Sequence, residues 1–204
     1  RSDANPGIVA EAATFTKAFT QTYAGIVTYR PGVTVLSVDS ARRGVETNQG
    51  RFTASVLNVI PPHQAGGIVT RAGLVPAGGR WAPVNPLNYQ STLVPGVHVI
   101  GDAQGTGQPK SGHIANAEAK VCADALLRAF AGEQPDPAPM TNSACYSPIT
   151  ANTASWLTAV FAYDPASRSM KAVPASSGEA PSPTKDHFEK MFDWADNLFA
   201  DTFA

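Results

Sequence analysis

The sequence predicts an α/β fold that ends in a small α+β domain, and three patterns support this. An apolar run at 97–100 ends in Gly101 and Asp102, and an alanine-rich segment follows at 112–131. This is the pattern of a buried strand, a turn and a long helix. One helix pattern and three strand patterns precede it. After a proline-rich stretch, two strand patterns and a last helix pattern follow.

The beginning of the chain is expected to hold one helix and three strands. Residues 8–23 carry aromatic side chains four residues apart, which places them on one face of a helix. β-Branched residues at 33–38 follow a Pro-Gly pair and predict a strand. Further strands are expected at 43–47 and 52–60, with a turn at 48–50 between them.

The alanine-rich segment at 112–131 predicts the longest helix, because alanine has the highest helix propensity. Its apolar side chains form one stripe: Ile114, Ala117, Val121, Cys122, Ala125 and Leu126. Gly132 fits the position at which a helix ends. Three prolines within 133–139 then indicate a linker.

The end of the chain is expected to form two strands and a helix. Residues 154–163 and 170–173 have strand patterns, and 175–183 is rich in Ser, Pro and Gly, which predicts a loop. Thr184 is predicted to cap the last helix, with Asp186 in its first turn.

Composition narrows the class of protein. Hydrophobic residues make up 43% of the chain and charged residues 15%, which permits a core and argues against disorder. The net charge of −1 gives no sign of nucleic-acid binding. No apolar run approaches the roughly 20 residues of a membrane span. The spacing of His63, His98 and His187 predicts no metal site.

The turn and the helix start after the apolar run carry the polar groups that a flavin needs. Asp102 can accept hydrogen bonds from ribityl hydroxyls. The helix that begins near Gly112 can point its unpaired N–H groups at the pyrimidine edge, which becomes anionic on reduction. Lys110, beside Ser111, either neutralises that edge or is an ordinary solvated charge.

The two cysteines differ in their surroundings. Cys122 lies in the apolar stripe of the long helix and is expected to be a buried small side chain. Cys145 lies in a polar segment at 142–147, after the linker, where a loop is expected. Its chemistry alone leaves open whether it is structural or reactive.

These motifs resemble the C-terminal half of the flavoprotein subunit of flavocytochrome c sulfide dehydrogenase. The similar segments, in order, are 58–62, 65–66, 97–102, 109–116, 142–147, Trp194 and 201–203. The Gly-x-Gly-x-x-Gly fingerprint, the cysteine that carries covalently attached FAD and the first of two redox cysteines have no counterpart in this sequence. The resemblance therefore identifies the chain as a piece of such a protein.

The resemblance implies a glutathione-reductase-like architecture with two dinucleotide-binding domains. Residues 1–62 would end the second, NAD-like domain, 63–138 would be the C-terminal segment of the FAD-binding domain, and 139–204 would be the small C-terminal domain. We expect such a chain to be stable only beside the N-terminal half of the flavoprotein.

The same resemblance implies a function. The flavoprotein would oxidise sulfide through a cysteine disulfide and FAD, and would pass the electrons to a c-type cytochrome subunit that alone carries heme. The FAD attachment site would lie in the missing half, and the protein would be periplasmic, a compartment that suits a redox disulfide. Two alternatives are a quinone- or NAD(P)-linked flavin disulfide oxidoreductase and a cofactor-free cytochrome-docking module.

The implied site contains Cys145 as the second redox cysteine. The implied cofactor-binding residues are Gly101, Asp102, Lys110, Ser111, Gly112, His113, Asn116 and Trp194. His113 either lines an electron path or bonds a loop carbonyl at the helix start. Trp194 shares an apolar helix face with Met191, Leu198 and Phe199, so it packs in a core, contacts the isoalloxazine, or does both.

Overall fold

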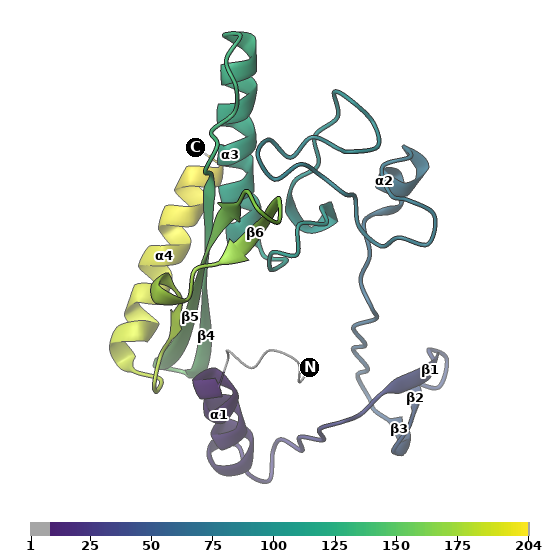
Figure 1. Cartoon of the computed structure of the whole chain (residues 1–204). Coiled ribbons are helices and arrows are strands. Elements are labelled where there is room, and N and C mark those ends of the chain that lie inside the picture. The colour runs from purple at the N-terminus through teal and green to yellow at the C-terminus, as the bar shows by residue number, and fades with distance from the viewer. Residues whose placement is uncertain (1–8, 204) are drawn as a thin grey trace. The chain divides into compact units, whose positions relative to one another are not determined.

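The computed structural model describes residues 9–203. The chain forms two compact units, one of residues 15–62 and a larger one of residues 9–14 and 63–203. Both are mixtures of helices and small antiparallel sheets (Figure 1). The expected α/β composition is thus confirmed. The assignment of the segments to dinucleotide-binding domains stays a prediction.

The smaller unit contains a three-stranded antiparallel sheet. Helix α1 (Val9–Lys17) continues into a π-helical turn (Ala18–Thr22), close to the predicted helix at 8–23, of which residue 8 lies outside the described residues. The sheet then follows in the order β1-β2-β3. Its strands are β1 (Val35–Asp39), β2 (Gly44–Thr47) and β3 (Gly50–Thr53).

The third strand is shorter than expected, so the prediction of a strand over 52–60 was wrong beyond Thr53. The β2–β3 pairing runs from Thr47 opposite Gly50 to Gly44 opposite Thr53. Gly44 is the first residue of β2, so no residue of β2 lies opposite the chain beyond Thr53. A chain without a neighbour cannot continue a ladder. The predicted turn at 48–50 is confirmed by the same register.

The first half of the larger unit is mostly irregular. Its small core cluster contains Leu74, Ala82 and Val99. The predicted buried strand at 97–100 was wrong, because only His98 makes an isolated bridge there. Val97 and Ile100 are exposed, and only Val99 of this run is buried. A five-residue helix, α2 (Gly67–Arg71), is the longest helix between 63 and 111.

Helix α3 (Gly112–Phe130) forms where the sequence predicts it. The Ser111 side chain caps its first turn by accepting a hydrogen bond from the Ile114 N–H, and Gly132 has a φ of +78° just beyond its end. The predicted apolar stripe is buried at four of its six positions: Ile114, Ala117, Cys122 and Ala125.

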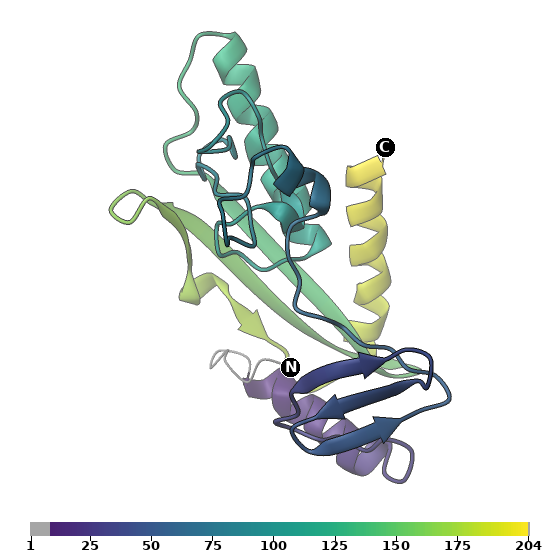
Figure 2. The ribbon, with the colours of Figure 1, turned by 90° about the vertical axis from the view of Figure 1, so that its right-hand side faces the viewer.

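A second antiparallel sheet completes the larger unit. Its strands are β4 (Met140–Thr150), β5 (Thr153–Asp164), β6 (Ser169–Ala172) and β7 (Gly178–Glu179), with β7 paired to β5. Helix α4 (Lys185–Phe203) follows. Helix α3 packs on β4 and α4 packs mainly on β5, as Figures 1 and 2 show.

Two expectations for this region were wrong. The segment that holds Cys145 is part of the eleven-residue strand β4, and not a loop, because it pairs with β5 along its length. The predicted loop at 175–183 contains the short strand β7. The Glu179 carboxylate of β7 accepts hydrogen bonds from the backbone N–H groups of Ala10 and Glu11 and so caps the start of α1.

The other expectations for the C-terminal segment are confirmed. Strand β5 covers the predicted 154–163, and β6 covers the predicted 170–173 except for its last residue. The Thr184 hydroxyl accepts a hydrogen bond of 3.1 Å from the His187 N–H at the start of α4. Within residues 9–203, no helix combines the length and the apolar character that crossing a membrane requires.

Candidate functional site

The N-terminal end of α3 presents backbone N–H groups that are not paired within the described chain. The Ser111 hydroxyl caps the Ile114 N–H at 3.3 Å, and the Ser111 carbonyl accepts from the Ala115 N–H. The N–H groups of Gly112 and His113 have no hydrogen-bond acceptor among the described residues. Unpaired N–H groups and the positive end of the helix dipole together favour a negatively charged ligand group.

The Gly101–Ala103 turn lies against the other side of α3. Gly101 has a φ of +67°, a left-handed conformation that glycine adopts without strain, and its N–H donates a 2.6 Å hydrogen bond to the Glu118 carboxylate. Asp102 is exposed, and its carboxylate makes no hydrogen bond within the described part of the chain. It is therefore available to accept bonds from a ligand.

Glu118 is the residue that sequence reasoning missed. Its side chain is fully buried, at 0% exposure, and accepts hydrogen bonds from Gly101 and from the side chains of Gln104 at 2.6 Å and Gln108 at 3.1 Å. Burial raises the pKa of the carboxyl to about 7, against the effect of these hydrogen bonds and of the Lys110 charge. Glu118 lies four residues from both Ile114 and Cys122, and so falls within the apolar stripe of the helix. This position was the sequence feature that could have predicted its burial.

The network around Glu118 continues into the sheet. The side-chain N–H of Gln108 also donates to the Tyr89 hydroxyl at 3.0 Å. The Thr141 hydroxyl of β4 donates to the side-chain oxygen of Gln108, Oε1. Tyr89 is fully buried, and burial raises the pKa of its phenol. The network therefore joins α3, the loop before it and β4 into one polar layer.

Lys110 is half-buried and not an ordinary solvated charge. Its ammonium donates to the Gln104 carbonyl and lies 4.4 Å from the centre of the Trp81 ring. Burial lowers the pKa of the ammonium, and the negative charges of Glu118 and Asp102 offset part of this by raising it. The lysine thus places a positive charge close to the start of α3.

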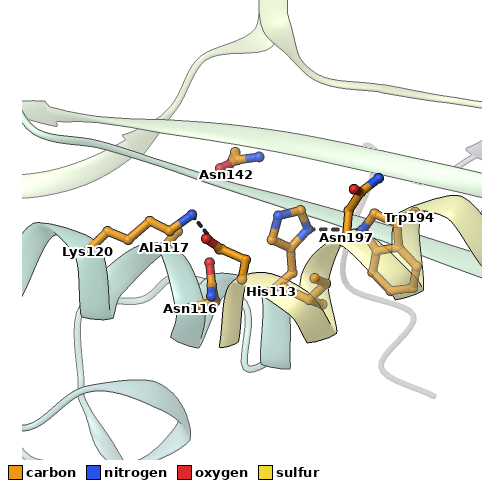
Figure 3. A pocket seen from close by; sticks show the side chains of 9 residues that line it. His113, Asn116, Ala117, Lys120, Asn142, Trp194 and Asn197 are labelled. Carbon is orange, nitrogen blue, oxygen red and sulfur yellow. Dashed lines mark hydrogen bonds and ion pairs between the residues drawn. The ribbon is translucent and has the colours of Figure 1, made fainter. Parts of the chain in front are cut away.

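The hydrogen bonds of His113 determine its tautomer. Its Nδ1 accepts from the Ala144 N–H at 3.0 Å and from the Trp194 indole N–H at 3.3 Å (Figure 3). Both partners can only donate, so Nδ1 carries no proton and the neutral ring carries it on Nε2. The expected bond to a loop carbonyl is therefore replaced by one from a strand amide.

A pocket of about 430 Å³ lies between α3, α4 and β4. Its lining residues are His113, Asn116, Ala117, Lys120, Asn142, Trp194, Asn197, Leu198 and Asp201. Figure 3 shows the imidazole of His113 between the two helices. The Asn116 amide donates to the Thr202 hydroxyl at 3.1 Å, and Lys120 pairs with Asp201 at 2.5 Å. These contacts join α3 to the last turns of α4.

Trp194 connects the pocket to the sheet. Its ring centre lies 5.5 Å from that of Tyr146 and 6.1 Å from that of His113. Leu198 and Met191 are half-buried beside it on α4, as predicted, but Phe199 is 60% exposed. Trp194 therefore both packs on the sheet and lines the pocket.

Cys145 lies on the other face of β4. Side chains alternate along a strand, so Cys145 shares its face with Ser143 and Ser147, while Tyr146 and Trp194 lie on the opposite side. The Ser143 hydroxyl is 3.2 Å from the Ser111 hydroxyl that caps α3. The face of β4 that carries the half-buried thiol therefore meets the start of α3.

Cys122 is buried, as expected. Its sulfur is 3.6 Å from Nδ1 of His98, and burial raises the pKa of the thiol. Nδ1 of His98 also lies 2.8 Å from the Asn88 carbonyl oxygen, so this ring nitrogen is hydrogen-bonded. Neither cysteine forms a disulfide within the described chain. No cluster of His, Cys, Asp and Glu among residues 9–203 is suited to a metal ion.

The predicted site residues thus surround the N-terminal end of α3 but fall into two groups. Ser111, Gly112, His113, Asn116 and Trp194 belong to the helix start and the pocket. The second group, Gly101, Asp102 and Lys110, lies towards Glu118, roughly half a turn around the helix from His113.

A comparison with protein families matches residues 137–203 to the family described as flavocytochrome c sulphide dehydrogenase, flavin-binding. The matched segment comprises β4 to α4, with Cys145 and Trp194 within it. This segment therefore matches the flavin-binding domain family of flavocytochrome c sulphide dehydrogenase, the family that the sequence motifs resemble.

Proposed function

We propose that the chain is part of a flavoprotein that oxidises sulfide through a cysteine disulfide and FAD, with a c-type cytochrome as electron acceptor. The observation that carries this is the contact between Ser143 and Ser111 at 3.2 Å. It brings the Cys145 face of β4 to the helix end that favours an anionic group. A thiol and an electron-accepting ring can therefore share this site.

The residues present fit a flavin. Asp102 offers unpaired carboxylate oxygens for ribityl hydroxyls, and the N–H groups of Gly112 and His113 offer donors for the pyrimidine edge. Lys110 adds a positive charge. The two groups of residues lie on different sides of α3, which suits an elongated cofactor better than a compact one. FAD, when bound, would take up two electrons and release them singly to a heme.

Cys145 would act as one half of a disulfide whose other cysteine lies outside this chain. Hydrosulfide attacks one sulfur of that disulfide, a new sulfur–sulfur bond forms, and the other cysteine leaves as a thiolate. The start of α3 stabilises negative charge near this thiolate. Asp102, Lys110 and the amides of the helix start would hold and orient the cofactor.

The cytochrome partner and the periplasmic location are part of the same proposal. The matched family name supports a cytochrome partner. An oxidising compartment keeps the disulfide formed between turnovers. In this proposal the heme acceptor lies on the partner subunit.

Cys145→Ser tests the proposal in the intact, FAD-loaded flavoprotein. Serine has a similar shape but cannot form a disulfide, so bound FAD should remain while sulfide-driven flavin reduction falls by roughly a thousandfold or more. Cys122→Ser is the matched control, and its reduction rate should stay within about threefold of wild type, with a modest loss of stability from burying a hydroxyl. Stopped-flow absorbance at the flavin band measures both rates.

Wild-type reduction rates in Cys145→Ser would exclude the disulfide mechanism. An equal loss in both variants would indicate damage to the fold. A colourless intact protein would support a cytochrome-docking module instead. Faster oxidation of the reduced flavin by a quinone or NAD(P)⁺ than by a c-type cytochrome would support the other alternative.

A further inference from the structure

Glu118 is a buried carboxyl that the proposed reaction does not use. One oxygen, Oε2, accepts the backbone N–H of Gly101, and the other, Oε1, accepts the amides of Gln104 and Gln108. Gln104 in turn accepts the backbone N–H of Thr106. The carboxyl thus bonds the Gly101 turn directly and the loop behind it through one side chain.

We propose that Glu118 is a positioning residue whose ionised carboxylate holds the Gly101–Ala103 turn, and with it Asp102, in place, and that the turn loosens when the carboxyl takes up a proton. The Gly101 bond is the shortest contact between the turn and α3, at 2.6 Å. Gly101 has a left-handed φ, and a glycine in an unrestrained loop samples many other conformations. Among the described residues this is the hydrogen bond that joins the turn to α3, while the Ala82 N–H holds the far end of the turn by donating to the Ala103 carbonyl at 2.9 Å.

Protonation changes the number of bonds that the carboxyl can accept. An ionised carboxylate accepts all three N–H groups, and hydrogen bonds to a charged acceptor are the stronger ones. A protonated carboxyl has a hydroxyl that must itself donate, and its oxygens are weaker acceptors. The side chains of Gln104 and Gln108 present N–H groups to Oε1, so the hydroxyl falls on Oε2 and weakens the Gly101 bond.

Three other titratable groups face Glu118 from the elements around it. Lys110 favours the ionised form, and Asp102 disfavours it. Tyr89, from the irregular segment, interacts with Glu118 but keeps its proton, because its pKa is raised further by burial. Burial of Glu118 itself raises its pKa to about 7, so both forms are populated near neutral pH.

The consequence for a cofactor rests on the proposed function, but the behaviour of the turn does not. If Asp102 holds the ribityl chain, then its position depends on the charge of Glu118. Acid pH would weaken that hold without removing Asp102 itself. The test therefore needs no flavin and is made on the full chain.

The test follows backbone amide signals by NMR between pH 5 and 9. In the wild-type chain, the Gly101 signal should move with a midpoint near 7, and protection of that amide from exchange should fall about tenfold or more on the acid side. Glu118→Gln should abolish the titration and leave the weakly protected state at every pH. Asp124→Asn, an exposed carboxylate change on the same helix, should leave the titration unchanged.

A second variant keeps Glu118 and so guards against a folding defect. Gln104→Met removes a donor to the ionised carboxyl, which should move the Gly101 midpoint to higher pH. A Gly101 signal without a titration in the folded wild-type chain would overturn the inference. A midpoint unchanged in Gln104→Met would do the same. Neither result would touch the proposed sulfide oxidation, which depends on Cys145 and on bound FAD.

Discussion

At the scale of single residues, the buried carboxyl of Glu118 affects stability in a way that can be worked out. Burial raises its pKa from 4.5 to about 7 in the folded protein. The folded state therefore holds a proton that the unfolded state has lost between these values. Its contribution to stability is complete below pH 4.5 and disappears as the pH rises to 7.

We expect the free energy of unfolding of wild type, relative to that of Glu118→Gln, to fall by about 3 kcal/mol between pH 4.5 and pH 8. Glutamine has no proton to lose, so the variant lacks this part of the pH dependence. Urea unfolding of both proteins at several pH values measures the difference. A constant difference across this range would show that Glu118 keeps an ordinary pKa.

Asp102 should contribute little to the stability of the chain, because its side chain is exposed and makes no hydrogen bond within the described residues. Asp102→Ala should change the stability of the flavin-free chain by less than about 0.5 kcal/mol. In the intact flavoprotein, the ribityl hydroxyls would lose an acceptor, at a cost of ~1–3 kcal/mol. Slower flavin incorporation and a shifted flavin spectrum are expected. Equal flavin content and identical spectra would remove Asp102 from the cofactor site.

At the scale of elements, α4 has one side on the sheet and another in solvent. Trp194 packs on Tyr146 and donates to His113, whereas Phe192, Phe199 and Phe203 are more than half exposed. The helix has no fully buried residue. Its attachment therefore depends on partly exposed contacts, and the Trp194 indole makes two of them.

Trp194→Phe should destabilise the larger unit by about 1 kcal/mol, because it removes the indole N–H that His113 accepts. Phe199→Ser is the matched control. Its ring already lies 60% in solvent, so the change should stay within about 0.5 kcal/mol. Thermal unfolding followed by circular dichroism compares the two. A larger effect from Phe199→Ser would mean that the exposed side of α4 is covered in solution.

At the scale of the whole molecule, the two units differ in how much they bury. In the smaller unit, Val35, Leu36 and Val38 of β1 are 46–67% exposed. In the larger unit, Ile114 and Glu118 of α3 are almost inaccessible to solvent. Few buried apolar contacts mean that local opening costs little free energy.

Amide protons of β1–β3 should therefore exchange with solvent at least about tenfold faster than those of the central turns of α3. Hydrogen exchange followed by mass spectrometry resolves both segments. Equal protection would show that the small sheet and α3 open together. The β4–β5 hairpin, which is long and covered by both helices, is expected to exchange as slowly as α3.

The sequence by itself determined those features that depend on neighbouring residues. Ser111 and Gly132 mark the two ends of α3, and Thr184 marks the start of α4, because capping is a local interaction. The motif around Cys145 resembles the family whose model matches residues 137–203. The strand pattern at 154–163 likewise predicted β5, which pairs with β4 close by in the chain.

Only the tertiary structure decided features that depend on distant contacts. The polar segment around Cys145 is a strand because β5 pairs with it, and the apolar run at 97–100 is not a strand because it gains only one isolated bridge. Glu118 is buried because donors from an irregular loop surround it, and His113 has its tautomer because a strand and a second helix donate to it. Packing brings such partners together from distant parts of the chain, so local sequence patterns do not predict them.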